Sequence, residues 1–387
     1  MDYSLSNDQE MIKKAAKEFF EKECPKEKVR ELKEDPKGFD PKMWKKMVEL
    51  GYVGLIIPEQ FGGTEGDFVE LAVFAEEMGR NIAPSPFYST GVLCAMPLIE
   101  FGTEEQQKKY LPRIAEKGDI WSFAQTEQKG DYEADDIKMK AVAEGEEFVL
   151  NGTKLFVPFA TSAKTFLVVA RTADGNDPQQ GVSLFIVDAK SAGISIELMP
   201  TAARDCRCEV QFADVKVPKE NLLGDLNDGW KIVDTILQYG AVAKAAEMSG
   251  GAQQALTIAV DYARERKQFG KSIGSFQAIQ HTLVDLLTHV DGLKYLVYEA
   301  AWKISQGTPS KMLNSMVKAK ANVVYHQVGY HGMVTHGAIG WTEEMDIGLY
   351  HLRTKVNQFD GGGTDLHLER IAGELENMEP DYMKLYG

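Results

Sequence analysis

The sequence has few cysteines, a deficit of positive charge and no long apolar run. Its four cysteines in 387 residues are too few for a disulfide scaffold. Cys206 and Cys208 lie close together, but no second Cys/His pair has zinc-ligand spacing nearby, so we expect reduced thiols and no metal site. The formal net charge of −15 disfavours nucleic acid and anionic membrane surfaces as partners, because both attract a basic face.

Targeting and membrane-spanning segments are also missing. No apolar run approaches the roughly 18 residues of a membrane span, and the first residues lack the basic-then-apolar pattern of a secretory signal. We therefore expect a cytoplasmic protein with no membrane span. Hydrophobic residues make up 44% of the chain and charged residues 26%, an ordinary globular composition. The length of 387 residues allows two or three domains.

Helical patterns dominate residues 1–118. Ser6 or Asn7 is typical of a helix cap, and apolar residues then recur at helical spacing. Residues 39–50 and 68–78 repeat the pattern, and Thr103, followed by a glutamine at the capping-box spacing, opens a further helix. These signals predict an N-terminal helical domain.

The pattern changes to strands over residues 119–226. Asn151-Gly152 lies between two apolar runs, which predicts a hairpin because both residues tolerate positive φ. Pro218 closes the last of the predicted strands. The further strands are expected at residues 165–170, 182–187, 194–198 and 209–217.

Helical patterns return over residues 227–387. Residues 230–264 predict one very long helix, and two more are expected at 275–306 and 309–336. Gly250 and Gly251 interrupt the first of these, where each glycine costs about 1 kcal/mol in a helix interior. We therefore expect another helix to approach closely at these glycines.

Several motifs, in the right order along the chain, resemble those of the acyl-CoA dehydrogenase family. Residues 150–157, Leu-Asn-Gly-Thr-Lys-Leu-Phe-Val, are similar to the family's Leu-Asn-Gly-x-Lys-x-Trp-Ile segment. Residues 262–270 resemble its Tyr-x-x-x-Arg-x-x-Phe-Gly signature, and Phe276-Gln277 follow. The other matches are 123–127 to the Thr-Glu-Pro flavin loop, 336–340 to a Gly-Gly-x-Gly turn, and Gly363-Thr364 to the Gly-Thr after the usual catalytic glutamate.

The resemblance implies a fold, a cofactor and partners. The fold would be multi-domain α+β, with an N-terminal all-α domain, a middle β-barrel or sandwich-like domain and a C-terminal four-helix-bundle-like domain. It also implies FAD, an acyl-CoA substrate, an electron-transfer flavoprotein as electron acceptor, and an oligomer, either a homotetramer or a hetero-oligomer with a related subunit. In the family, the arginine at position 266 reaches the FAD of a neighbouring subunit.

Individual residues carry these implications. Phe156 would cover one face of the flavin ring, Thr126 would donate to its edge, and Arg266 would hold the pyrophosphate through its fork of donors. Packing or solvent-facing roles remain the alternative for each. The FAD-binding residues carried over from the family are Phe123, Thr126, Phe156, Val157, Arg266, Phe269, Gln277, Gly337 and Thr364. Tyr88, Tyr239 and Gly362 are expected to face the substrate, and Arg204 is the one candidate cation for a second carboxylate.

The sequence departs from the family where the reaction occurs. The family base is a glutamate directly before Gly-Thr, and that position is Gly362 here; a second family position for the base is Gly240. Pro158 stands where the family has Ser or Thr beside the flavin, and proline has no donor. Asp360 is the nearest substitute base, although a turn role beside three glycines explains it equally well. Glu127 and Asp131 are lesser candidates.

Three functions fit this pattern. The first is an active dehydrogenase with a displaced base, acting on a cyclic, branched, aryl or dicarboxylic acyl-CoA. The second is a base-lacking subunit of a heteromeric dehydrogenase. The third is a flavoprotein of the same fold with other chemistry, such as desulfination.

Overall fold

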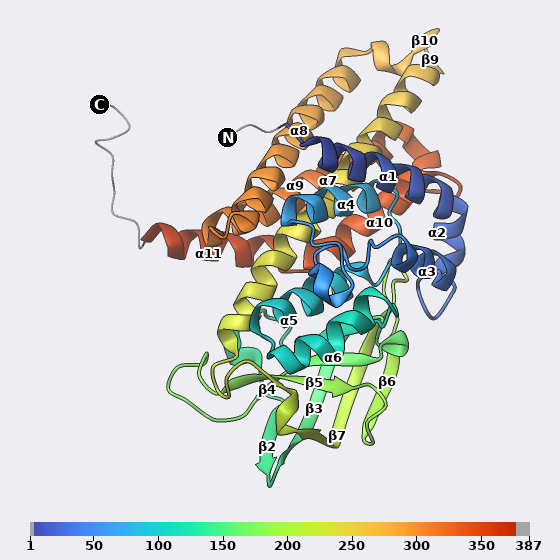
Figure 1. The fold of residues 1–387 in the computed structure, drawn as a ribbon. Helices are drawn as coiled ribbons and strands as arrows, with labels where there is room; N and C mark the ends of the chain where they lie inside the picture. The colour runs from blue at the N-terminus through green and yellow to red at the C-terminus, as the bar shows by residue number, and fades with distance from the viewer. Residues whose placement is uncertain (1–3, 377–387) are drawn as a thin grey trace.

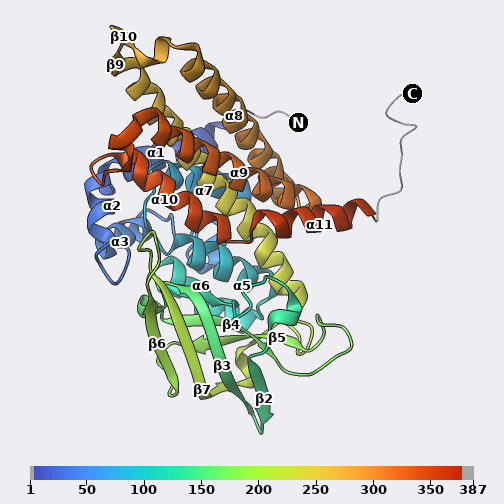
Figure 2. The same ribbon diagram turned by 180° about the vertical axis from the view of Figure 1, so that it is seen from behind.

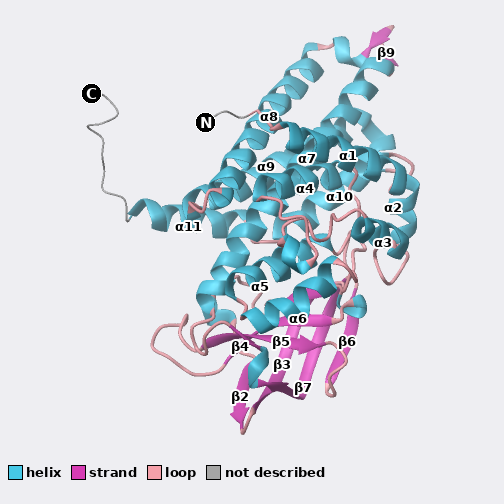
Figure 3. Ribbon diagram, in the orientation of Figure 1, coloured by secondary structure: helices cyan, strands magenta, loops and turns pink. Residues whose placement is uncertain are grey.

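The structure is a computed structural model that describes residues 4–376. A helical region, a β region and a second helical region follow one another along the chain, in the order that the sequence predicts. Figure 1 shows the sheet at one end of the molecule and the long C-terminal helices reaching away from it. The same arrangement is seen from behind in Figure 2, with helices and strands distinguished in Figure 3.

The N-terminal region begins with the capping interaction that the sequence predicts. The Ser6 side chain accepts from Gln9 N, and the Gln9 side chain accepts in return, so that α1 begins at Asn7. Thr103 and Gln106 form the same box at the start of α6. The helices are α1 (Asn7–Glu23), α2 (Lys26–Leu32), α3 (Pro41–Glu49), α4 (Phe68–Arg80), the π-helix η2 (Tyr88–Ala95), α5 (Met96–Phe101) and α6 (Glu104–Ala115).

The β region contains one sheet of eight strands. The order is β6-β7-β3-β2-β4-β5-β8, and β1 pairs in parallel with β4. Its strands are β1 (Trp121–Ala124), β2 (Lys140–Glu144), β3 (Glu147–Pro158), β4 (Thr165–Arg171), β5 (Val182–Asp188), β6 (Ile194–Met199), β7 (Arg207–Pro218) and β8 (Leu222–Leu223).

The predicted hairpin at Asn151-Gly152 is wrong. Both residues lie inside β3, and the turn comes earlier, at the β2–β3 connection. The reason is an interaction with β7: Asn151 Nδ2 donates to Asp214 Oδ1 at 3.0 Å, and Asp214 N donates back to Asn151 Oδ1 at 2.9 Å. The register shifts between Leu150 and Gly152, so the Asn-Gly pair forms a bulge within a continuous strand.

The C-terminal region is helical, with the long helices where the sequence predicts them. They are α7 (Trp230–Glu265), α8 (Gln277–Ser305), α9 (Lys311–His336), α10 (Asp346–Phe359) and α11 (Thr364–Glu376). A small hairpin of β9 (Lys267–Gln268) and β10 (Lys271–Ser272) joins α7 to α8 at the end farthest from the sheet (Figure 1).

The close approach expected at the glycines of α7 is present. A Cβ on Gly250 would lie 1.8 Å from Glu76 O of α4, and a Cβ on Gly79 of α4 would lie 1.8 Å from Glu247 O of α7. The two helices therefore cross backbone to backbone, and this contact sets the position of the α7 turn that carries Lys244 and Glu247. No helix within residues 4–376 is both long and apolar enough to cross a membrane.

Candidate functional site

A cavity of about 50 Å³ lies between the sheet and the helices. Strands β1 and β3 supply one wall, and η2, α7 and the segment after α10 supply the other. The residues that line it are Tyr88, Leu93, Phe123, Gln125, Thr126, Tyr132, Leu155, Phe156, Pro158, Arg207, Leu237, Asp360 and Gly361. We call it the ring cavity.

Three residues predicted to bind FAD meet at the ring cavity. Phe123, Thr126 and Phe156 line it together, although Thr126 and Phe156 are thirty residues apart in sequence. Phe156 has φ of 54° and is 49% exposed, so its ring is not part of a core. Val157 is different, because its side chain is buried in the core of the β region and only its backbone is available to a ligand.

The polar groups of the ring cavity suit a flavin. Both side-chain polar atoms of Gln125 are buried, and neither has a hydrogen-bond partner among the described residues. Buried polar atoms of this kind are normally satisfied, so Gln125 fits a ligand that both donates and accepts. Together with the exposed face of Phe156, these groups match the donors, acceptors and apolar surface of an isoalloxazine ring.

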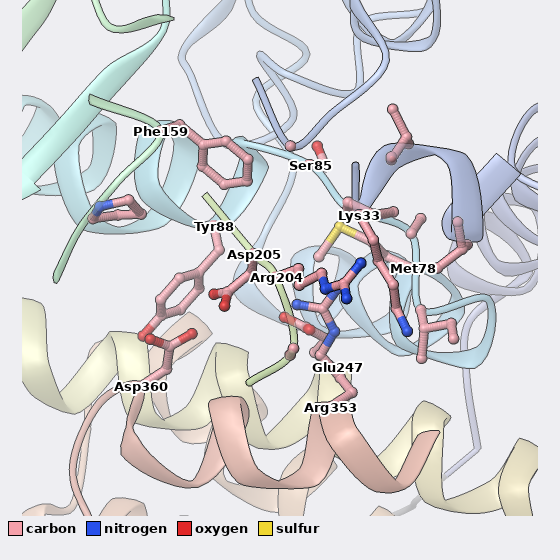
Figure 4. A pocket seen from close by; sticks show the side chains of 18 of the residues that line it. Lys33, Met78, Ser85, Tyr88, Phe159, Arg204, Asp205, Glu247, Arg353 and Asp360 are labelled. Atoms are coloured by element: carbon pink, nitrogen blue, oxygen red, sulfur yellow. The ribbon is translucent and has the colours of Figure 1, made fainter. Parts of the chain in front are cut away.

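Asp360 is the C-cap residue of α10 and lies at the edge of the ring cavity. Its Oδ2 atom lies 2.7 Å from Arg207 Nη2 and 3.3 Å from Lys244 Nζ. Each cation has a second acid: Arg207 Nε lies 2.6 Å from Asp205 Oδ2, and Lys244 Nζ lies 2.6 Å from Glu247 Oε2. Asp360 is thus the centre of a buried charge network contributed by β7, α7 and α10. Figure 4 shows Asp360 beside Tyr88 at one end of a second cavity.

The network sets the protonation state of Asp360. Burial alone raises the pKa of its carboxyl group, but the charges and hydrogen bonds of Arg207 and Lys244 outweigh burial and hold the pKa below its ordinary value. Asp360 is therefore ionised at neutral pH. A carboxylate with a low pKa accepts a proton less readily than one tuned near neutrality, so these ion pairs weaken it as a base.

The glycine loop after Asp360 is fixed from behind by buried groups. Lys318 Nζ donates to Gly362 O at 3.1 Å and to Asn357 O at 3.0 Å, and His367 Nε2 lies 2.9 Å from Gly361 O. Gly362 has φ of 105°, and its amide donates to Phe359 O. The loop is therefore held in one conformation, with Gly361 facing the ring cavity.

The two tyrosines that were predicted to face the substrate lie in different cavities. Tyr88 lines the ring cavity, donates to Gly240 O at 3.1 Å and lies under Lys244, whose Nζ is 4.1 Å from the ring centroid. Tyr239 lines a different, open cleft with Asp234 and packs against Phe68. The structure brings Tyr88, but not Tyr239, to the ring cavity.

The remaining predicted FAD residues fall outside the ring cavity. Arg266 and Phe269 lie on and beside the β9–β10 hairpin, and Phe269 is 91% exposed. Gln277 begins α8, and Gly337 follows α9 beside Tyr262, which stacks on His336. Thr364 begins α11, next to the glycine loop. Within one chain the predicted FAD residues therefore form two groups, one at each end of α7.

The lesser candidates for the base are engaged elsewhere. Glu127 is buried, lies 2.7 Å from Lys154 Nζ and accepts from the backbone amides of Lys138 and Met139. Asp131 is exposed and pairs with Lys129. Among the described residues that line the ring cavity, Asp360 is the only carboxylic acid.

Arg207 and Lys244 are the charged site residues that the sequence analysis missed. Arg207 stands between two cysteines at the start of β7, and Lys244 stands in an alanine-rich stretch of α7. A lone lysine on an otherwise apolar helical turn is a signal that could have identified Lys244, because an unpaired lysine is rarely buried. Arg207 gave no such signal, since it pairs with Asp360 across 153 positions of sequence.

Comparison with known proteins agrees with the order of the three regions. Models of the N-terminal, middle and C-terminal domains of acyl-CoA dehydrogenase match residues 6–118, 122–215 and 227–376. A subunit of the caffeyl-CoA reductase–Etf complex of Acetobacterium woodii is 34% identical over 96% of this chain and 99% of its own. The acryloyl-CoA reductase (NADH) of Anaerotignum propionicum is 32% identical over 97% and 96%.

A solved structure of a related enzyme has the same fold. Butyryl-CoA dehydrogenase from Megasphaera elsdenii superposes with a TM-score of 0.90 at 29% identity, over 97% of this chain and 100% of its own. The matching domain models together span most of the chain and follow the helical–β–helical order of the structure. The chain belongs to the acyl-CoA dehydrogenase family of FAD-dependent oxidoreductases.

Proposed function

We propose that this protein binds FAD and interconverts an acyl-CoA thioester with its 2-enoyl-CoA, with Asp360 as the group that exchanges the α proton. The observation that carries the proposal is the ring cavity. It joins Thr126 and Phe156, the residues predicted to hold the flavin, to a single carboxylate, Asp360, and to the glycine loop. The acyl group is of an unusual class, because the family's usual base positions are Gly362 and Gly240.

The two groups of FAD residues support an oligomer. The ring cavity holds only one group, and Arg266, Phe269, Gln277 and Gly337 lie near the far end of α7 (Figure 1). We propose that a second copy of the chain brings this second group to the FAD of the first. The exposure of the Phe269 ring, 91%, is consistent with a residue that contacts another chain.

In the proposed reaction, FAD and the residues of the ring cavity have different roles. When bound, FAD supplies the acceptor for the hydrogen that leaves the β carbon with its electron pair. Asp360 takes the α proton, and the electron pair of that C–H bond forms the carbon–carbon double bond. Arg207 and Lys244 keep Asp360 ionised before the reaction. Phe156 and Leu237 supply apolar surface at the same cavity, which would limit the access of water to a bound acyl group.

The names of two relatives favour the reverse direction. Both the caffeyl-CoA and the acryloyl-CoA enzymes are reductases. The same site serves both directions, and the balance is set by the electron partner. The Etf complex named for the first relative supports an electron-transfer flavoprotein as that partner.

A second candidate function is a base-lacking subunit of a heteromeric dehydrogenase. The two ion pairs of Asp360 favour it, because they lower the basicity of the only carboxylate at the cavity. Co-purification of a second related chain from the native host would support this candidate.

The experiment is an anaerobic titration of the purified yellow protein. Straight, branched, aryl and dicarboxylic acyl-CoA thioesters are added, and flavin absorbance near its visible maximum is followed. In parallel, the dithionite-reduced protein is mixed with the matching enoyl-CoA thioesters. Bleaching in the first series, or reoxidation in the second, is expected for one substrate class. No change in either series at full FAD occupancy would reject the proposal and favour the base-lacking subunit.

A further inference from the structure

A second cavity, of about 60 Å³, adjoins the ring cavity beyond Asp360. The two cavities share Tyr88, Pro158, Arg207 and Asp360 in their linings. The far wall is built from the end of α2, the segment 203–205 and one face of α10 (Figure 4). The two cavities are therefore adjacent, with Asp360 at their boundary.

The second cavity has more cations than acids. Lys33, Arg204, Arg207, Lys244 and Arg353 line it, against Asp205, Glu247 and Asp360. All three acids are engaged by Arg207 and Lys244. Two cations offset only two of these three negative charges, and the charge of Arg353 also acts on Asp205, where burial raises the pKa of the carboxyl group but Arg207 and Arg353 together lower it. Five cations against three acids leave the lining with a net charge of +2, and neither Lys33 nor Arg204 forms an ion pair with an acid of the cavity among the described residues.

The three remaining cations have little compensation elsewhere. Among the described residues Arg204 pairs only with Glu34, and both side chains are largely exposed, so solvent screens that pair. The side chains of Lys33 and Arg353 are half-buried, and neither has an ion pair or a hydrogen bond among residues 4–376. Burial lowers the pKa of Lys33; the charge of Glu343 opposes this, and the nearby positive charges of Arg353 and Arg204 lower the pKa further. Figure 4 shows the side chains of Arg204 and Arg353 among those that line this cavity.

An anion is the ligand that this arrangement of charges suits. Half-buried like charges are costly unless a counter-charge is present, and a guanidinium fork matches the two oxygens of a carboxylate. The volume of about 60 Å³ suits a small group rather than a long alkyl chain or fused rings. Met78 and Ile82 supply apolar contacts for one or two methylene groups on the way.

We propose that the second cavity binds a carboxylate at the far end of the acyl group, so that the substrate is a monothioester of a short dicarboxylic acid, with Arg353 as the principal partner of that carboxylate. The assignment rests on the proposed function, because it extends the acyl group from the ring cavity. It also means that Arg204, the cation expected from the sequence, is one member of a larger set.

The test compares glutaryl-CoA with 5-methylhexanoyl-CoA, whose terminal isopropyl group has the shape of a carboxylate without its charge. The kcat/KM for flavin bleaching is expected to be about 10- to 100-fold higher for glutaryl-CoA, the range of one charged hydrogen-bonded contact. Arg353→Gln should remove that preference, and Arg353→Lys should restore part of it. Lys33→Gln should reduce it, whereas Lys190→Gln, which removes an exposed charge after β5, should not.

A binding measurement separates the two proposals. The FAD-loaded protein is titrated with glutarate, 5-methylhexanamide, which has no carboxylate, and inorganic phosphate, and heat of binding is followed. Glutarate that binds more tightly than both, with the difference lost in Arg353→Gln, supports the carboxylate site even if no thioester bleaches the flavin. Equal kcat/KM for the two thioesters would overturn the carboxylate site and leave the proposed function intact. Phosphate that competes as well as glutarate would also overturn it, since the site would then select anions unrelated to an acyl group.

Discussion

At the scale of single residues, the function depends on Asp360. Asp360→Asn should lower the rate of flavin bleaching by about 100- to 10,000-fold, the usual contribution of a positioned base. The variant also removes the partner of Arg207 and Lys244. The stability cost should be less than the about 3–5 kcal/mol of a fully broken buried pair, because Asp205 and Glu247 remain. Stopped-flow absorbance measures the rate, and FAD content and circular dichroism confirm folding.

The matched control for that variant lies on the same helix. Asp346→Asn breaks the ion pair with Arg30 at the other end of α10, outside the ring cavity, and should leave the rate unchanged. A rate in Asp360→Asn equal to that of the control would remove Asp360 as the proton acceptor. The second candidate function would then gain weight.

The same ion pairs predict a flat pH profile. The pKa of Asp360 is held below its ordinary value, so the carboxylate form persists as pH falls, and it is lost only below the range of a free aspartate. The bleaching rate should therefore not decline between about pH 8 and about pH 5. A decline of about tenfold per pH unit below neutrality would indicate a base with a higher pKa than Asp360 has here. Pre-steady-state rates across this range provide the measurement.

The sequence predicts single site residues, but it does not predict which residues pair with them when the partners are far apart along the chain. Phe123, Thr126, Phe156, Tyr88 and Asp360 were named, and they line one cavity. The partners of Asp360 were not, because Lys244 is more than a hundred positions away and Arg207 still farther. Local patterns carry no information on such pairs, and a charged residue in a strand or helix is usually a solvated one.

At the scale of elements, glycines decide how closely α4 and α7 cross. Gly250→Ala should lower the free energy of unfolding by about 1–3 kcal/mol, because its Cβ would lie 1.8 Å from Glu76 O and the helices must separate. Gly292→Ala in α8 is the control, since a Cβ there meets nothing within 4 Å and alanine favours a helix. Urea unfolding of both variants measures the difference. Equal stability of the two variants would contradict the close crossing.

Elements were predicted where their signals are local. The caps at Ser6 and Thr103 and the length of α7 follow from residues within a few turns of each other. The Asn151-Gly152 hairpin failed because its outcome depends on Asp214, a residue on another strand. The glycines of α7 gave the correct expectation, because a glycine in a long helix has a cost that only a close neighbour explains.

At the scale of the whole molecule, the two groups of FAD residues predict that each site is shared between chains. Arg266→Gln should weaken FAD binding by about 10- to 100-fold, the range for loss of a charge-assisted contact, although Arg266 is remote from the ring cavity of its own chain. Flavin fluorescence on dilution measures the loss. The Asp360→Asn variant should keep its FAD, so that the two variants fail for different reasons.

Mixing the two variants tests the sharing directly. In a mixed oligomer, a site that combines the Asp360 of the Arg266→Gln chain with the Arg266 of the Asp360→Asn chain has every predicted group. Unfolding and refolding the two variants together, with FAD at a concentration that saturates the original protein but not Arg266→Gln, should therefore recover a fraction of the original bleaching rate, whereas either variant refolded alone at the same FAD concentration should recover much less. If each site were complete within one chain, every site in the mixture would carry one defect. If the mixture recovers no more bleaching activity than the separate variants, and FAD elutes with a monomer in size-exclusion chromatography, the FAD site is not shared between chains.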